Sequence, residues 1–251
     1  MVHFVGAGPG APDLITLRGA ELLREADQII YAGSLVNPAL LEGRKAGCTV
    51  LDSSSMTLEE VLEAVYGAEK AGKTTVRLHT GDPSIYGAVQ EQMNALDAAG
   101  IPYDVTPGVS SLCGAAAALK AEYTPPEVSQ TVIITRAEGR TPVPEREKLS
   151  GLASHHSTMV LFLSAGLADR VQSELLEGGY EPDTPAAVVY RATWPDEKVF
   201  RCTVGTLAET VEANRITRTA LLTIGDFLDP DDHRSRLYDP EFSHGYREKK
   251  T

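Results

Sequence analysis

Short apolar runs alternate with amphipathic stretches along most of the chain. Val2–Val5, Gln28–Tyr31 and Thr75–Leu78 have the length and composition of buried strands. Between such runs, apolar residues recur three or four positions apart, which places them on one face of a helix. Thr57 followed by Glu60 has the capping-box spacing of a helix start. Strands that alternate with helices are typical of a parallel sheet with helical crossovers, and therefore of an α/β fold.

A proline-containing segment, Lys120–Gln130, interrupts this alternation. We predict a domain boundary there, with a first αβα domain at residues 1–120 and a second at residues 121–229. Residues 230–251 are polar and charged, and we predict a C-terminal tail.

The second half of the chain has a different strand order. Ala186–Tyr190 and Val199–Thr203 are predicted strands, and only a short turn around Trp194 separates them. A connection without a helix favours an antiparallel pair, so we predict a parallel sheet in the first domain and a mixed sheet in the second. We interpret Trp194 as a packed turn residue.

Composition and charge narrow the class of protein. The chain has 251 residues and a formal net charge of −12, which argues against nucleic-acid binding. Cys48, Cys113 and Cys202 are widely separated and odd in number, so we expect a reducing compartment and no structural zinc. The chain shows no signal-peptide pattern and no run approaching the roughly 18 apolar residues of a membrane span. These features predict a cytoplasmic protein without a membrane partner.

A glycine-rich turn, Gly6–Ala11, follows the first predicted strand and formally fits the dinucleotide fingerprint G-x-G-x-x-G/A. Pro9 and Pro12, however, have no N–H group to offer a phosphate. Residues 28–41 also contain no Asp or Glu to hold a ribose hydroxyl. The turn therefore indicates close approach to a ligand that is not a nicotinamide or flavin dinucleotide.

Two more turns follow predicted strands. Gly81-Asp82-Pro83 comes after the strand that ends at Leu78, and we predict that a helix begins there with Asp82 as its N-cap. Thr106–Ser111 has the same position after a later strand, although its serines can equally serve as helix caps. Because ligands bind at the carboxyl ends of parallel strands, the three turns predict one shared cleft.

In this order and spacing, GAGPGAPDLIT, HTGDPSIYG and TPGVSS resemble the tetrapyrrole C-methyltransferases, over roughly residues 2–228. The segments YAGSLV (31–36) and TRAEGRTPVPE (135–145) are similar to the branch of this family that methylates carbon 11 of precorrin-4. The resemblance implies S-adenosyl-L-methionine as cofactor, S-adenosyl-L-homocysteine as product and a role in cobalamin biosynthesis on precorrin-4 or cobalt-precorrin-4. It also implies a homodimer and an active site in the cleft between the two domains.

The resemblance further implies individual site residues. The cofactor contacts are expected, several of them through the backbone, at Pro9, Gly81, Asp82, Pro83, Tyr86, Ser110, Ser111, Leu163, Ala192 and Ala220. Leu163 departs from the family pattern, in which a methionine often occupies this position. Methyl transfer from a sulfonium to an electron-rich ring needs neither a metal nor a nucleophilic triad, and no catalytic base is assigned.

Arginines suit a substrate that carries many carboxylates, because a guanidinium binds a carboxylate through two hydrogen bonds. Arg136, Arg140 and Arg191 are the candidates, and each can equally be an ordinary solvated charge. His155 and His156 are adjacent and have no third ligand nearby in sequence, so we predict no metal site.

Three other interpretations stay open on the sequence. The first is another branch of the family, acting on uroporphyrinogen III or on a different precorrin carbon. The second is an NAD-dependent oxidoreductase, and the third is a tetrapyrrole-binding module without activity.

Overall fold

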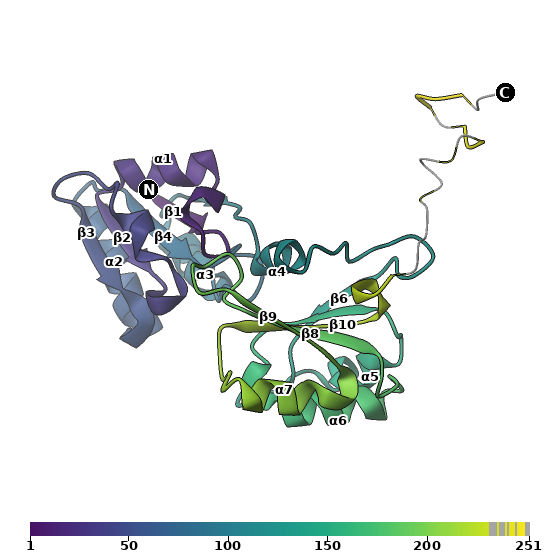
Figure 1. The fold of residues 1–251 in the computed structure, drawn as a ribbon. Helices are drawn as coiled ribbons and strands as arrows, with labels where there is room; N and C mark the ends of the chain where they lie inside the picture. The colour runs from purple at the N-terminus through teal and green to yellow at the C-terminus, as the bar shows by residue number, and fades with distance from the viewer. Residues whose placement is uncertain (231–234, 236–238, 240, 244, 249–251) are drawn as a thin grey trace. The chain divides into compact units, whose positions relative to one another are not determined.

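The computed structural model describes residues 1–230, 235, 239, 241–243 and 245–248, and the chain divides into two compact units. Unit 1 consists of Met1–Gly114 together with Ala192–Asp196, and unit 2 consists of Ala115–Arg191 and Glu197–Thr251 (Figure 1). The domain bounds at residues 1–120 and 121–229 stay a prediction. Much of the predicted tail at 230–251 lies outside the described residues.

Unit 1 is built on a five-stranded sheet. Its strands and helices are β1 (Val2–Gly6), α1 (Leu17–Glu25), β2 (Gln28–Tyr31), β3 (Thr49–Asp52), α2 (Leu58–Lys70), β4 (Thr75–His79), α3 (Gln90–Ala99), β5 (Tyr103–Thr106) and the start of α4 (Ser111–Leu119). The strand order is β3-β2-β4-β1-β5, and every neighbouring pair is parallel. The predicted parallel sheet is confirmed.

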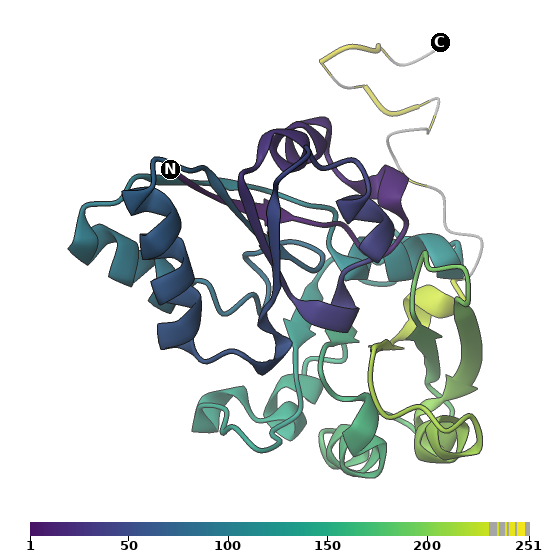
Figure 2. The same ribbon diagram turned by 90° about the vertical axis from the view of Figure 1, so that its left-hand side faces the viewer.

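Helices cover both faces of this sheet (Figure 2). Leu23 of α1 belongs to the buried cluster on one face, together with Val5 and Val76. Val61 of α2 belongs to the cluster that contains Phe4 on the other face. Successive strand residues point to opposite faces, so these hydrophobic strands are buried on both sides, as expected for a parallel sheet.

α1 begins at Leu17, where the hydroxyl of Thr16 accepts a hydrogen bond from Gly19 N at 3.1 Å. Another helix begins later than the sequence predicts. The helix expected to start after Asp82 begins only at Gln90. The intervening residues form turns, which matters for the site described below.

Unit 2 holds a second five-stranded sheet. Its elements are β6 (Val132–Thr135), α5 (Leu149–Ala153), β7 (Thr158–Leu161), α6 (Ala168–Glu177), β8 (Pro185–Tyr190), β9 (Lys198–Thr203), α7 (Leu207–Ala213) and β10 (Ala220–Ile224). The order is β6-β7-β10-β8-β9; β6 and β7 are parallel, and the other neighbouring pairs are antiparallel. The predicted mixed sheet and the antiparallel pair β8–β9 are confirmed, and with them the α/β class.

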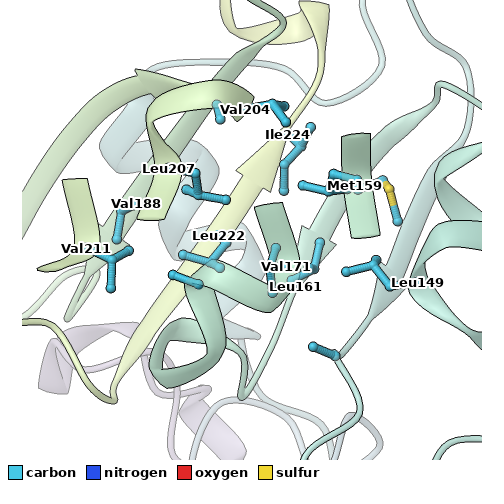
Figure 3. Packing of buried hydrophobic residues seen from close by; sticks show 14 of the residues in the cluster. Leu149, Met159, Leu161, Val171, Val188, Val204, Leu207, Val211, Leu222 and Ile224 are labelled. Atoms are coloured by element: carbon cyan, nitrogen blue, oxygen red, sulfur yellow. The ribbon is translucent and has the colours of Figure 1, made fainter. Parts of the chain in front are cut away.

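The core of unit 2 lies between its sheet and the helices α5, α6 and α7. Figure 3 shows Leu161 and Leu222 from the sheet facing Val171 of α6, with Val211 of α7 beside them. All four side chains are almost completely buried. This packing fixes the strands whose ends carry the candidate residues of unit 2.

Candidate functional site

The three predicted turns of unit 1 meet through their backbones. Gly8 N donates to Gly81 O at 3.2 Å, and Gly81 N donates to Gly8 O at 2.9 Å. A Cβ atom on Gly6 would lie 2.5 Å from Gly108 Cα, and one on Gly108 would lie 2.2 Å from Gly81 O. These positions have no room for any side chain, which is the physical reason for the glycines. We call Gly6–Ala11, Gly81–Pro83 and Thr106–Ser111 the turn cluster.

Asp82 joins the second turn to the third. Its Oδ1 accepts hydrogen bonds from Ser84 N at 2.8 Å and from the Ser84 hydroxyl, and its Oδ2 accepts one from Gly108 N at 2.8 Å. Burial tends to raise the pKa of Asp82, but these hydrogen bonds outweigh it and hold the pKa below the ordinary value. The predicted helix N-cap role of Asp82 is wrong, because its carboxylate stabilises turns and not a helix end.

Three N–H groups of the first turn are engaged within unit 1. Ala7 N donates to His79 O at 2.7 Å, Gly8 N to Gly81 O, and Ala11 N to Thr193 Oγ1 at 3.0 Å. A dinucleotide site needs such groups to point at a pyrophosphate. These three donors are therefore not available to a pyrophosphate.

The segment Ala192–Asp196 belongs to unit 1 and packs on the first turn. Trp194 Nε1 donates to Pro9 O at 3.1 Å, and a Cβ atom on Gly10 would lie 2.1 Å from Trp194 Cδ1. A Cβ on Gly114 would lie 3.0 Å from Pro9 Cβ and 3.4 Å from Ala192 Cβ. The structure thus brings the candidates Pro9 and Ala192 together. Trp194 was predicted to pack in its turn, but its partner leaves no local signal, because it lies 185 positions away in the sequence.

The other candidates of unit 1 lie at or beside the turn cluster. Gly81 approaches Ser111, since its notional Cβ would lie 3.4 Å from Ser111 N. Ser110 and Ser111 are half-buried, and Ser110 O accepts hydrogen bonds from the first turn of α4. Pro83 is buried, whereas Tyr86 is 45% exposed with a φ of 54°. An exposed aromatic side chain beside buried turns is suited to contact a ligand.

Two candidates in unit 2 follow or begin strands. Leu163 comes after β7, has a φ of 54°, and is 71% exposed. The buried Ser164 next to it holds this strand end to the end of β6, since its hydroxyl accepts from Ala137 N at 2.8 Å and donates to Phe162 O. A large apolar side chain exposed on such a fixed, left-handed backbone position is unusual. Ala220 begins β10, where it pairs with Tyr190.

The three candidate arginines have different surroundings. Arg136 folds back on its own loop, with Nη1 donating to Thr141 O at 3.1 Å and Nη2 to Pro142 O at 2.8 Å. Arg140 is exposed on the same loop. Arg191 is half-buried at the end of β8. Arg136 therefore shapes the loop, and Arg140 is better placed to meet a partner.

Sequence reasoning missed the arginine that anchors this loop from outside. Arg170 of α6 donates through Nη1 to Glu138 O at 2.7 Å and through Nη2 to Glu138 Oε2 at 3.0 Å. Hydrogen bonds to Glu174 first and then to Glu138 raise the pKa of Arg170, and the hydrogen bond from Arg170 lowers the pKa of Glu138. A separation of 32 positions between the partners leaves no local signal in the sequence.

Two buried basic side chains on β4 were also missed, because the strand reads as an apolar run. Arg77 is 7% exposed and His79 is 4% exposed. Burial lowers the pKa of Arg77 to about 10; burial and the charge of Arg77 lower the pKa of His79 to about 3. The His79 ring stacks on Phe4, with centroids 6.1 Å apart, and its Nε2 has no hydrogen-bond partner within the described structure.

Among the described residues, no group of three or more His, Cys, Asp or Glu side chains is arranged to hold a metal ion. Within the same part of the chain, no helix is long and apolar enough to cross a membrane.

The profile of the Tetrapyrrole (Corrin/Porphyrin) Methylases matches residues 1–208. The chain therefore belongs to the tetrapyrrole methylase family, and the resemblance predicted from the three turns is confirmed. A cobalt-precorrin-4 C(11)-methyltransferase of Methanocaldococcus jannaschii is 54% identical, over 98% of this chain and 95% of its own. A precorrin-4 C(11)-methyltransferase of Pseudomonas aeruginosa is 44% identical, over 98% of each chain.

Solved structures agree with this assignment. The X-ray structure of a cobalt precorrin-4 methyltransferase has a TM-score of 0.89 and 49% sequence identity, covering 91% of this chain and 96% of its own. A uroporphyrin-III C-methyl transferase of Thermus thermophilus, complexed with S-adenyl homocysteine, has a TM-score of 0.76 and 26% identity, covering 91% and 93%.

Proposed function

We propose that this protein transfers a methyl group from S-adenosyl-L-methionine to carbon 11 of precorrin-4 or cobalt-precorrin-4, in cobalamin biosynthesis. The observation that carries the proposal is the full-length similarity to enzymes of that name, at 44–54% identity. The turn cluster supports it, because its three turns meet at the carboxyl ends of parallel strands, where α/β sheets bind ligands.

The residues of the turn cluster fit S-adenosyl-L-methionine. This cofactor has no phosphate, so the engagement of Ala7 N, Gly8 N and Ala11 N in hydrogen bonds is no obstacle to its binding. When bound, it supplies a methyl group on a positively charged sulfur. We propose that Pro9, Gly81, Asp82, Pro83, Tyr86, Ser110, Ser111, Leu163, Ala192 and Ala220 contact it.

The protein's contribution is to bind and orient the reactants and to exclude water. Asp82 holds two turns in register through three hydrogen bonds, so the backbone around it is rigid before any ligand arrives. Orientation of two reactants in a fixed geometry supplies on the order of 7–11 kcal/mol of a barrier. We assign no residue to the removal of the proton that the macrocycle loses after its ring carbon has taken up the methyl group.

For the substrate, we propose that Arg140 and Arg191 bind its carboxylates. Arg140 is exposed on a loop whose shape is held by Arg136 and Arg170. A guanidinium on such a supported loop can form paired hydrogen bonds to a carboxylate. We propose that Arg136 contributes to substrate binding indirectly, because its hydrogen bonds hold the backbone of the loop that carries Arg140.

The decisive experiment is incubation with S-adenosyl-L-methionine labelled with ¹³C on its methyl group. Precorrin-4, cobalt-precorrin-4 and uroporphyrinogen III are offered separately, and NMR identifies the methylated carbon. We expect label at carbon 11 of one or both of the first two compounds. Label only on uroporphyrinogen III, or on another carbon, would move the protein to a different branch of the family.

A binding measurement separates the other classes. Trp194 is the single tryptophan of the chain and touches the first turn, so its fluorescence should change when S-adenosyl-L-homocysteine binds. We expect saturable binding of this compound and none of NAD. Binding of NAD alone would favour an oxidoreductase, and tetrapyrrole binding without methyl transfer would favour a carrier module.

We also propose a homodimer located in the cytoplasm. The family resemblance supports the dimer, and the cysteine content supports a reducing compartment. Light scattering at micromolar concentration should give twice the chain mass of 26.9 kDa. A monomer mass at that concentration would contradict the proposal.

A further inference from the structure

The chain between Asp82 and α3 has an unusual backbone. Tyr86 and Ala88 have φ values of 54° and 49°, in the left-handed region that residues other than glycine rarely adopt. Gly87 between them packs so tightly that a Cβ atom would lie 2.1 Å from Pro83 O. Such a conformation persists only where the surroundings hold it. We call residues 83–89 the left-handed loop.

One side chain holds the carboxyl end of this loop. Gln92, in the first turn of α3 and only 7% exposed, donates through Nε2 to Ala88 O at 2.9 Å. Its Oε1 accepts a hydrogen bond from Arg77 Nε at 3.1 Å. The orientation of the amide is fixed by chemistry, because a guanidinium only donates and a carbonyl only accepts.

Arg77 in turn ties Gln92 to the sheet. Its side chain is buried, and its Nη1 donates to Ile30 O of β2 at 3.1 Å. No ion pair with a carboxylate is recorded for Arg77 among the described residues. Burying the guanidinium of Arg77 with only a carbonyl and an amide as acceptors costs free energy. Its hydrogen bonds to both acceptors hold Gln92 in a fixed position.

We propose that Arg77 and Gln92 are positioning residues for cofactor binding. Arg77 holds Gln92, Gln92 holds Ala88, and Ala88 fixes the left-handed loop that carries Pro83 and Tyr86. Asp82 anchors the loop at its start, and Gln92 anchors it at its end. The inference rests on the proposed function, because it takes the loop to contact S-adenosyl-L-methionine.

The chain contains a matched control for this relay. Gln28 of β2 is also 7% exposed, and its Nε2 donates to Ala64 O at 3.1 Å and to Thr75 Oγ1 at 3.3 Å. It has the same burial and bonds a carbonyl and a β4 side chain, as Gln92 does. Its carbonyl partner, however, lies inside α2 and not on the loop.

Gln92→Glu separates the two hydrogen bonds of Gln92. A carboxylate keeps the acceptor for Arg77 but has no N–H for Ala88 O. We expect the dissociation constant of S-adenosyl-L-homocysteine to rise roughly tenfold, the effect of losing one hydrogen bond. The rate at saturating S-adenosyl-L-methionine should stay near that of the wild type, because the Arg77 contact remains, whereas the urea midpoint should fall, since Ala88 O loses its donor.

Gln92→Met and Gln28→Met complete the test. Both should lower the urea midpoint, since each removes buried hydrogen bonds, but only Gln92→Met should weaken cofactor binding. Unchanged affinity in Gln92→Glu, or equal loss in Gln28→Met and Gln92→Met, would overturn the relay. Absence of binding in the wild type would instead overturn the proposed function, so the two failures are distinguishable.

Discussion

The turn cluster of unit 1 and the loops of unit 2 present candidate residues in opposite ways. In the turn cluster, backbone atoms approach so closely that Gly6 and Gly108 have no room for side chains. In unit 2, Leu163 and Arg140 extend exposed side chains from loops that Ser164, Arg136 and Arg170 hold in place. The turn cluster depends on positions that have no side chain, whereas the loops of unit 2 depend on side chains that are exposed to a ligand.

The difference indicates which substitutions each region tolerates. A backbone-built region should fail when a single methyl group is added, because backbone atoms cannot move aside cheaply. A region built from exposed side chains should keep its fold when one of them is removed, and should lose only the contact that this side chain makes. The predictions below test that contrast.

The largest effect is expected for Gly108→Ala. Its Cβ would lie 2.2 Å from Gly81 O, a backbone atom, so the turn cluster has to open. We expect a loss of about 3 kcal/mol of unfolding free energy, at the upper end for overpacking, and no detectable binding of S-adenosyl-L-homocysteine. Urea unfolding and calorimetry measure the two quantities.

Gly139→Ala is the counterpart in the unit 2 loop. Its Cβ would meet only Leu167 Cδ1, at 3.3 Å, and that side chain can shift. We expect a change within about 0.5 kcal/mol, as for most surface substitutions. Comparable damage from Gly108→Ala and Gly139→Ala would remove the contrast between the two regions.

The next largest effect is expected for Asp82→Asn. Asp82 accepts hydrogen bonds on both carboxylate oxygens, and an asparagine would turn an NH₂ group toward Gly108 N or toward Ser84. We expect affinity for S-adenosyl-L-homocysteine to fall roughly 10- to 100-fold, the cost of one unsatisfied buried donor. Calorimetry with Asp82→Leu beside it should show a still larger loss. Intact binding with activity abolished in both variants would make Asp82 a chemical participant.

Arg140→Ala should affect the substrate alone. Because Arg140 is exposed, the fold should be unchanged, and tetrapyrrole affinity should drop roughly tenfold through loss of a charged hydrogen bond. S-adenosyl-L-homocysteine should bind as in the wild type. Arg146→Ala, at an exposed arginine nearby, is the control in a tetrapyrrole titration. Equal effects from the two variants would reduce Arg140 to a general surface charge.

The last prediction concerns pH and His79. Its folded-state pKa of about 3 lies below its ordinary 6.5, so the unfolded chain takes up a proton that the folded chain refuses. Stability from this group is complete above pH 6.5 and is lost as the pH falls from 6.5 toward 3. Between pH 7.5 and 5.5 the loss should be about 1 kcal/mol. His79→Phe should reduce this slope in urea unfolding, whereas His155→Gln, at an exposed histidine of unit 2, should leave it unchanged.

Much of the fold was predictable because its signals are local. The strand Gln28–Tyr31 and the capping box of Thr57 and Glu60 are observed where the pattern placed them. The late start of α3 was not, since Asp82 and Pro83 have the composition of a helix start but are held in turns by Gly108. The choice between a helix start and a turn depends on Gly108, which lies 26 positions after Asp82 in the sequence.

The candidate site was predictable in part for the same reason. Glycines after strands mark the turn cluster, and the motifs around them identify the family. The supporting residues Arg77, Gln92 and Arg170 left no signal, because a basic residue in a strand or helix and a glutamine in a helix are ordinary in isolation. Their roles follow from partners in other elements, which only the folded chain brings within hydrogen-bond distance.

Unit 1 is discontinuous along the chain, and this has a consequence for its synthesis. Thr193 and Trp194 bind Ala11 and Pro9, which are 182 and 185 positions earlier. After residue 114 has been made, a ribosome that adds 5–20 residues per second needs on the order of 10 s to reach residue 192. During that interval the first turn lacks its two hydrogen-bond partners, although most of unit 2 has been synthesised. The N-terminal unit is therefore synthesised first, but its hydrogen bonds are completed only after residue 194 has been added.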